Sequence, residues 1–540
     1  MAASWSWRLL AGATLAALPW LNPFAQGPSP AVQPWLASMA CAIALWLLAA
    51  AGGSGGRLRV FWPALALVAW TALSHLSVRP ELVFLVAGIA LVAVVASIAD
   101  ETGFPEALQA GFLAAAVLSA LAGLVQYFGL APAFAPWMNG AAAGEAYANL
   151  RQPNQFATLC WIGGAVIVFG TLRLPRVLAF ALLVLLAAGS AASVSRTGLL
   201  QGMMLTLLAL LWGGPQRRER LLLCIAAALA YIAASWLLPV LLEAMQGAQP
   251  ARTLWGRLGG GQACSSRLVL WSNVLHLIGQ KPLAGWGWGE LDYAHYMTLY
   301  RDARFCDILD NAHNLPLHIA VELGVPAALL VCGGTAWWAW RQRPWSEAAP
   351  LRQLAWALFA LLVLHSMLEY PLWYGPFQMA LGASLGWLLG RPVREPGEAL
   401  HLPSAAAAAG LLALTGYAAW DYARVSQIYL APEQRHAAWS DDTLEHVRRS
   451  WLFSGQARFA DLTLALPTAA NARWMHGLAE QMLHYSPEPR VIERVIESSA
   501  ALGREDEALL HLARYRAAFP KESDAWRAEQ RKPLQWPAPP

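Results

Sequence analysis

The polar residues at the start of the apolar run 311–326 are the strongest candidates for chemistry in this sequence. His313, Asn314 and His318 lie at its opening, and Glu322 follows one helical turn deeper. Burying such groups in a bilayer is costly unless they are paired or hydrated, so an intramembrane polar cluster is a candidate functional site. The alternative is a helix end whose polar residues lie at the level of the lipid headgroups.

Other polar residues lie at the expected ends of apolar runs, on the same expected face. They are Arg151 with Gln152 and Asn154, Arg196, Arg267, and His365 with Glu369 and Tyr370. Three arginines on one face of an apolar protein suggest an anionic ligand held in bidentate fashion. A pyrophosphate on a lipid carrier meets that demand, because its tail would lie in the bilayer. Taken singly, each arginine has the alternative role of snorkelling to phospholipid phosphates.

The elements that must position these residues are long apolar segments. Of the 540 residues 57% are hydrophobic and only 13% are charged, whereas soluble domains carry about 25% charged residues. The sequence therefore predicts an all-α, polytopic membrane protein with about 12–13 transmembrane helices. The expected spans are 8–22, 31–51, 60–77, 80–99, 106–130, 156–172, 177–194, 197–213, 221–241, 314–339, 352–368, 374–390 and 404–420.

Arginine placement sets the expected orientation. Clusters such as Arg217 with Arg218 and Arg341 with Arg343 fall in alternate short loops, which the positive-inside rule assigns to the cytoplasm. The amino terminus is then inside, and the first apolar run favours an uncleaved helix over a signal peptide. The segments 242–312 and 421–540 fall on the outer face. One miscounted helix would move the carboxyl-terminal segment to the cytoplasm.

Four regions follow from this reading. They are an amino-terminal transmembrane bundle at 1–241, a large periplasmic loop at 242–312, carboxyl-terminal transmembrane helices at 313–420 and a soluble helical domain at 421–540. In the last region, apolar residues recur at helical spacing over 471–485, 490–502 and 504–518, with Gly503 between the last two. Such helical hairpins resemble tetratricopeptide-type repeats, which form packing or peptide-binding surfaces.

The cysteines divide by location. Cys264 and Cys306 are the only two in the large outer loop, where an oxidising compartment would allow them to pair. Closing a loop of that length would stabilise the fold by about 4 kcal/mol on the chain-entropy estimate. The alternative is two free thiols. No cysteine pair has the C-x-x-C spacing of a metal site.

Six short motifs occur in order along the chain and together carry a family resemblance. They are Leu150-Arg-Gln-Pro-Asn154, Ser195-Arg-Thr-Gly198, Ser266-Arg-Leu-Val-Leu-Trp271, Pro282-Leu-Ala-Gly-Trp-Gly287, Ala312-His-Asn-Leu-Pro-Leu317 and His365-Ser-Met-Leu-Glu-Tyr-Pro-Leu372. The sequence thereby resembles the O-antigen ligase superfamily, and in particular its bacterial O-linked protein oligosaccharyltransferases that glycosylate pilins. The first and last motifs favour the protein-glycosylating branch.

The resemblance implies transfer of an oligosaccharide en bloc from undecaprenyl pyrophosphate to serine or threonine hydroxyls of a pilin-like acceptor protein. The site would face the periplasm in the inner membrane of a bacterium. Arg267 would stabilise the leaving pyrophosphate, assisted by Arg196 and Arg151. His313 would act as the general base or orient the acceptor, because a neutral imidazole can accept a proton.

The remaining candidates would position substrates. Asn314, Gln152, Asn154, His365, Glu369 and Tyr370 would contact sugars or the acceptor, and His318 with Glu322 would form a supporting pair four residues apart. The outer loops hold no Asp-x-Asp motif, so we expect metal-independent transfer without a cofactor. Membrane lipids are expected partners and nucleic acid is not. Position 155 is Gln where relatives often have a histidine, which puts a catalytic role there in doubt.

Two alternatives remain open. The first is a ligase acting on lipid A core, or a glycan polymerase, from the same superfamily. The second is a transporter of lipid-linked sugars, which should show inverted repeats and helices broken at mid-membrane. The sequence shows no such symmetry, and its polar residues gather at one face, so the transporter ranks last.

Overall fold

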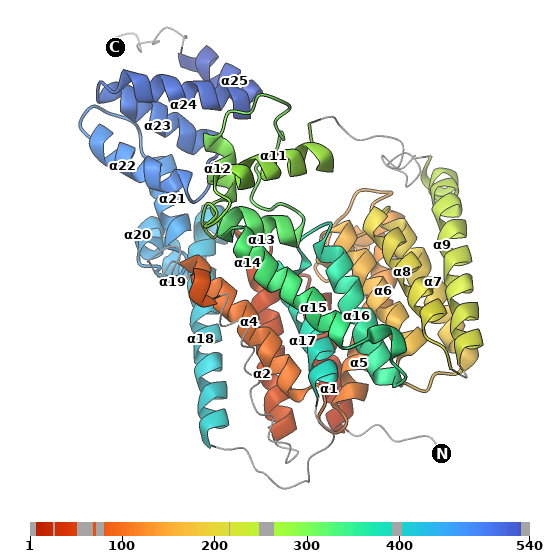
Figure 1. The fold of residues 1–540 in the computed structure, drawn as a ribbon. Coiled ribbons are helices and arrows are strands. Elements are labelled where there is room, and N and C mark those ends of the chain that lie inside the picture. The colour runs from red at the N-terminus through yellow and green to blue at the C-terminus, as the bar shows by residue number, and fades with distance from the viewer. Residues whose placement is uncertain are drawn as a thin grey trace. The chain divides into compact units, whose positions relative to one another are not determined.

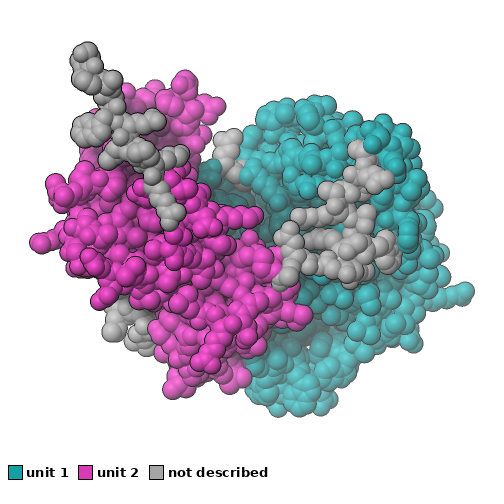
Figure 2. Space-filling view, turned by 90° about the horizontal axis from the view of Figure 1, so that it is seen from above, with its two compact units in different colours: residues 1–68, 83–260, 331–420 teal, residues 69–82, 261–330, 421–540 magenta. Residues whose placement is uncertain are grey.

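A computed structural model describes residues 7–24, 27–50, 68–71, 80–214, 216–247, 264–390 and 402–530. Over these ranges every regular element is helical and no strand occurs, as the sequence predicts (Figure 1). The chain divides into two compact units. Unit 1 comprises residues 1–68, 83–260 and 331–420, and unit 2 comprises residues 69–82, 261–330 and 421–540 (Figure 2).

Unit 1 is a bundle of apolar helices. Its main elements are α1 (Trp7–Leu21), α2 (Val32–Ala50), most of α4 (Pro80–Ile98), α5 (Phe104–Tyr127), α6 (Pro153–Phe169), α7 (Arg176–Ala192), α8 (Arg196–Leu211), α9 (Arg217–Gln246), α15 (Gly334–Arg341), α16 (Pro350–Ser366), α17 (Gly375–Leu389) and most of α18 (Leu402–Ser426). Large side chains such as Trp20, Phe112 and Phe377 are fully buried and pack edge to face in its core.

These helices coincide with the expected apolar runs. By length and composition α2, α5 and α9 can each cross a membrane, and α6, α7, α8, α16 and the segment Leu82–Ile98 are shorter apolar helices. The protein is a polytopic membrane protein. The expected span 60–77 lies outside the described residues except for 68–71.

The expected span 314–339 is interrupted. It consists of α13 (Leu315–Leu323), α14 (Val325–Ala328), a π-helical turn (Leu329–Gly333) and α15. Gly324 joins the first two pieces at φ 90°, outside the helical region, and Pro326 stands in the first turn of α14. A positive φ is open to glycine and closed to most other residues, so the interruption is built into the sequence.

Unit 2 combines part of the large loop with the carboxyl-terminal region. The loop contributes α11 (Arg267–Gln280) and α12 (Leu291–Met297), followed by α13 and α14. The carboxyl-terminal helices are α19 (Ala437–Ser440), α20 (Thr443–Arg448), α21 (Ser454–Leu464), α22 (Ala472–Leu483), α23 (Pro489–Ala501), α24 (Glu505–Ala518) and α25 (Pro520–Gln530). The last expected hairpins are confirmed, including the turn at Gly503, where φ is 72°.

The loop helix α12 packs into the carboxyl-terminal helices. Tyr296 is 2% exposed and shares a core with α22, α23 and α24. Its hydroxyl lies 2.9 Å from His511 Nδ1, and Arg514 donates a hydrogen bond to the carbonyl of Met297 at 3.1 Å. The four domain boundaries expected from the sequence remain a prediction, whereas the structure groups residues 261–330 with 421–540 in one unit.

Candidate functional site

The segment that leads to His313 is fastened to α11. Cys264 and Cys306 form a disulfide whose Cα atoms lie 5.4 Å apart. The Asn273 side chain donates to the carbonyl of Ala303 at 2.9 Å and accepts from the amide of Phe305 at 2.8 Å. These contacts fix an irregular segment against a helix, which compensates for its lack of regular backbone hydrogen bonds.

His313 is held by its neighbours on both sides. The indole of Trp271 donates to the carbonyl of Ala312 at 3.1 Å, and the side chain of Asn311 accepts from the amide of His313 at 2.8 Å. Asn314 caps α13 by accepting from the amide of Leu317 at 3.1 Å. His313 itself has φ 48°, a conformation that non-glycine residues adopt only when their surroundings enforce it. The backbone therefore presents a half-buried imidazole at a fixed place.

A close backbone contact supports the end of α13. The amides of Trp286 and Gly287 donate to the carbonyls of Val321 and Glu322, both at 2.8 Å. A Cβ on Gly285 would lie 2.3 Å from Glu322 backbone atoms. This contact explains Gly285 of the motif at 282–287, because a side chain at that position would collide with the backbone of α13.

His318 and Glu322 form the expected pair. His318 Nε2 lies 3.4 Å from Glu322 Oε2, and the two side chains are 4% and 1% exposed. Trp288 packs edge-on against His318 with ring centroids 6.0 Å apart. The pair lies one turn beyond the Asn314 cap.

Arg267 is the first residue of α11, directly after Ser266, whose side chain caps the helix. Its side chain is half-buried.

Asp310 lies in the segment that leads to His313. Desolvation raises the pKa of its carboxyl, and the nearby His313 lowers it. A carboxylate in this position would stabilise an imidazolium at His313.

In unit 1 Asn154 is the centre of a second polar cluster. Its side-chain amide donates to Glu369 Oε1 at 3.0 Å, and its oxygen accepts from the hydroxyl of Ser195 at 2.6 Å. Ser195 also caps α8, accepting from the amide of Gly198 at 3.0 Å. Three helices, α6, α8 and α16, are thereby linked at their ends by residues the sequence had singled out.

The cluster extends from Asn154 to His365 through Thr158 and Gln201, two residues that the sequence did not predict. The hydroxyl of Thr158 donates to the carbonyl of Asn154 at 2.9 Å and accepts from the Gln201 amide at 2.9 Å. It also lies 2.9 Å from His365 Nδ1, within hydrogen-bond distance. Thr158 stands four residues after Asn154, and this spacing is the signal that could have identified it.

The other expected residues of unit 1 have different surroundings. Gln152 caps α6, accepting from the amide of Gln155 at 2.6 Å.

Arg151 donates to the carbonyl of Pro23 at 3.0 Å and to Asn139 at 3.2 Å. Arg196 is exposed, and its guanidinium bonds to no described residue. Tyr370 stacks on Tyr374, with ring centroids 6.1 Å apart. Of the two arginines, Arg196 is the better placed to take up an anion.

A contact between α12 and α22 was also missed. His484 Nδ1 lies 2.6 Å from Glu290 Oε2, and the His484 ring stacks on Tyr293 with centroids 3.7 Å apart. Glu290 is 4% exposed. The carboxyl-terminal helices thus contact α12, which precedes the segment ending at His313. The partners are 194 positions apart in the sequence, so they leave no local pattern to detect.

Among the described residues, one group of side chains has a geometry able to hold a metal ion. It consists of His476, Glu480 and Glu507, on α22 and α24. Arg504 Nη1 lies 2.6 Å from His476 Nε2, so a guanidinium already faces the ring nitrogen that would bind the metal. None of the expected site residues belongs to this group.

Comparison with known proteins identifies two families and one relative. Residues 181–332 match the family described as O-Antigen ligase, and residues 353–533 match the carboxyl-terminal part of the virulence factor membrane-bound polymerases. The General O-oligosaccharyltransferase of Acinetobacter baylyi is 23% identical over 280 residues. That alignment covers 51% of this chain and 48% of the relative, so the chain matches about half the length of the curated protein.

Proposed function

We propose that this chain is an O-oligosaccharyltransferase of the O-antigen ligase superfamily. It transfers an oligosaccharide en bloc from undecaprenyl pyrophosphate to serine or threonine hydroxyls of pilin-like proteins. The reaction takes place at the periplasmic face of the bacterial inner membrane, without a metal ion.

One observation carries this proposal. The segment that matches the O-Antigen ligase family, 181–332, contains both Arg267 and His313. Both belong to unit 2, where a disulfide, Asn273 and Trp271 tie α11 to the segment ending at His313. A guanidinium and an imidazole on one cross-linked scaffold can stabilise a leaving pyrophosphate and accept the proton of an attacking hydroxyl.

The proposed reaction is a displacement at the anomeric carbon. The acceptor oxygen forms a bond to that carbon, and the bond from the carbon to the pyrophosphate oxygen breaks. The hydroxyl proton passes to His313, and Asp310 stabilises the imidazolium that results. Arg267 stabilises the negative charge that develops on the leaving pyrophosphate.

The unit 1 residues serve binding in this proposal. Arg196 is exposed at the first position of α8, where the helix dipole also favours an anion, and it contacts donor phosphate. The linked amide and carboxylate of Asn154 and Glu369 offer a donor and acceptors for sugar hydroxyls.

The test is transfer by the purified full-length protein with a lipid-linked oligosaccharide and either pilin or lipid A core as the acceptor. Glycosylated pilin, detected by a mass shift on a serine or threonine peptide, is the expected product. Arg267→Ala should lower the rate by about a hundredfold to a thousandfold. Arg301→Ala, a change at an exposed arginine of the same loop, should not. Modified lipid A core beside unmodified pilin would refute the proposal.

A second candidate is a glycan polymerase. The match of residues 353–533 to the carboxyl-terminal part of membrane-bound polymerases favours it. A polymerase would lengthen the glycan on its lipid carrier in the absence of any protein acceptor. Gel analysis of lipid-linked products with and without pilin therefore separates the two reactions.

A further inference from the structure

The arginine-rich end of unit 1 is formed by two loops that are bonded together. One joins α8 to α9 and the other joins α15 to α16. Trp212, which is 1% exposed, donates its indole hydrogen to the carbonyl of Pro344 at 2.7 Å. Arg220 donates to the Gln353 side chain at 2.8 Å. The two loops therefore form one continuous surface.

This surface holds a cavity of 680 Å³, lined by Trp340, Arg341, Arg343, Trp345 and Ser346. Trp340 is 63% exposed and Trp345 is 45% exposed. Exposed indoles at the end of membrane helices are typical of the interface between headgroups and acyl chains. The cavity thus combines an amphipathic aromatic wall with two cations.

Neither arginine of the cavity has an acidic partner among the described residues. Arg341 packs over the ring of Trp337 at 5.6 Å, a contact that leaves its N–H groups available. The nearby carboxylate of Glu347 is bound to Arg352 at 2.7 Å. Within the described part of the chain, the positive charge of the cavity is therefore uncompensated.

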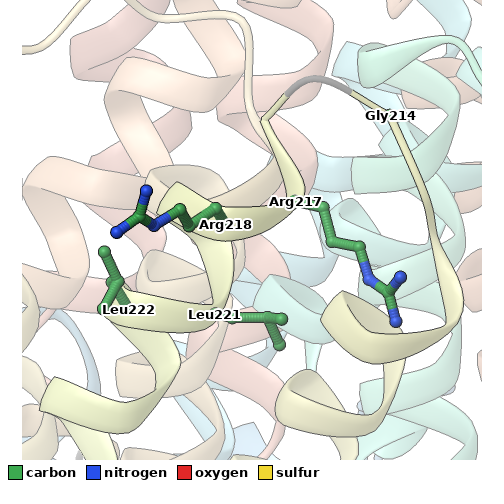
Figure 3. A pocket seen from close by; sticks show the side chains of 5 residues that line it. All are labelled: Gly214, Arg217, Arg218, Leu221 and Leu222. Atoms are coloured by element: carbon green, nitrogen blue, oxygen red, sulfur yellow. The ribbon is translucent and has the colours of Figure 1, made fainter.

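A second hollow of 450 Å³ lies on the other loop, lined by Gly214, Arg217, Arg218, Leu221 and Leu222. Figure 3 shows the Arg217 and Arg218 side chains leaving α9 in different directions. They do not converge on one point, so this hollow adds positive charge to the surface without forming a two-arginine clamp.

These cavities are separate from the cluster around Asn154. Arg196 starts α8 beside that cluster, whereas Leu211 ends the helix one residue before Trp212. Sixteen residues of α-helix span about 24 Å. The arginine-rich end is therefore the opposite end of the bundle, which the positive-inside rule assigns to the cytoplasm.

We propose that the cavity lined by Trp340, Arg341, Arg343, Trp345 and Ser346 binds the headgroup phosphate of an anionic phospholipid. The two guanidinium groups hold the phosphate. The hydroxyl of Ser346 donates to the carbonyl of Arg343 at 2.9 Å and supports the turn that carries this arginine. The exposed faces of Trp340 and Trp345 lie against the glycerol and the first methylenes of the acyl chains. Basic cavities at the cytoplasmic ends of membrane helices suit such headgroups.

The test is lipid binding by the full-length protein in detergent, followed by native mass spectrometry during titration. The probes are phosphatidylglycerol, phosphatidylcholine and inorganic phosphate. Phosphatidylglycerol should bind to the wild type. The double variant Arg341→Gln/Arg343→Gln should bind it about twenty-fivefold more weakly, at roughly fivefold per arginine. Arg173→Gln, at an exposed arginine lining neither cavity, should bind as the wild type does.

Three results would overturn the proposal. Equal loss in Arg173→Gln would mean that diffuse surface charge, not this cavity, attracts the lipid. Equal binding of phosphatidylcholine would mean that the site does not select an anionic headgroup. Displacement of phosphatidylglycerol by equimolar inorganic phosphate would identify a free-phosphate site. The measurement uses no glycan transfer, so its outcome is independent of the proposed function.

Discussion

In unit 1 the polar residues around Asn154 are fixed by bonds between side chains, whereas in unit 2 the segment around His313 is fixed through its backbone. Asn154, Ser195, Thr158 and His365 bond to one another across three helices. His313 is held by a bond to its amide and a bond to the preceding carbonyl. The first arrangement ties side chains of three helices to one another, and the second ties backbone atoms on either side of the imidazole.

This difference suggests a division of labour. Side chains bonded to one another across three helices are held in fixed positions, which suits recognition. A loop that is fixed through its backbone suits a side chain that must gain and lose a proton. Protonation of that side chain does not break the hydrogen bonds that hold the loop. The predictions below separate the two arrangements.

The largest expected effect is on catalysis at His313. His313→Ala should lower the rate of transfer about a hundredfold to ten-thousandfold, the range for losing a general base. Because backbone groups hold the segment, the protein should remain folded and should still bind the lipid-linked donor. Transfer kinetics and donor binding measured on the same preparation check this. The matched control is His276→Ala, at an exposed histidine of α11. A fully active His313→Ala would remove His313 from the mechanism.

The disulfide should have the next largest effect. Replacing Cys264 and Cys306 by alanine removes a cross-link over 42 residues, worth about 4 kcal/mol on the chain-entropy estimate. Unit 2 should then be cut faster by proteases between α11 and α13, while the bundle of unit 1 stays intact. Cys332→Ala, a change outside this loop, is the control. Unchanged cleavage under reducing conditions would show that the cross-link does not brace the loop.

The sequence predicts the helices well and the site in part. A long apolar run in a bilayer forms a helix, because every backbone N–H and C=O group must find its hydrogen-bond partner within the segment. For the same reason α2, α5 and α17 coincide closely with expected spans. The break at Gly324 was missed because a single glycine in an apolar run resembles a tolerated helix residue.

Residues of the site could be predicted where a motif or a helix end marks them, as at Asn154 and Asn314. The partners Thr158 and Gln201 lie within apolar helices and have no such mark. The Glu290–His484 contact joins residues 194 positions apart, and only the fold brings them together. Long-range side-chain pairs of this kind leave no periodic signal in one sequence.

A smaller effect is expected within the unit 1 cluster. Asn154→Ala should destabilise the protein by about 1–3 kcal/mol, because it leaves Glu369 and Ser195 with unmet hydrogen bonds. In a double-mutant cycle with Glu369→Gln the two changes should be non-additive by about 0.5–3 kcal/mol. Thermal unfolding of all four proteins measures the coupling. Additive losses would mean that the two side chains do not act as a unit.

The smallest expected effect is a pH dependence confined to unit 2. His295 accepts the hydroxyl hydrogen of Tyr300 at Nδ1, 2.8 Å away, and its Nε2 faces the carbonyl of Phe305 at 3.3 Å. Burial lowers the pKa of His295 to about 3, and Arg304 acts in the same direction. The unfolded chain, with an ordinary histidine pKa near 6.5, binds the proton first.

The contribution of neutral His295 to the free energy of unfolding is therefore fully present above about pH 6.5. It declines as the pH falls toward 3. Protease resistance of the segment between α12 and α13 should fall from pH 7.5 to 5.5 in the wild type. His295→Gln keeps a donor for the Phe305 carbonyl and cannot take up a proton, so its resistance should change less over that range. Equal changes in the two proteins would show that another group controls the loop.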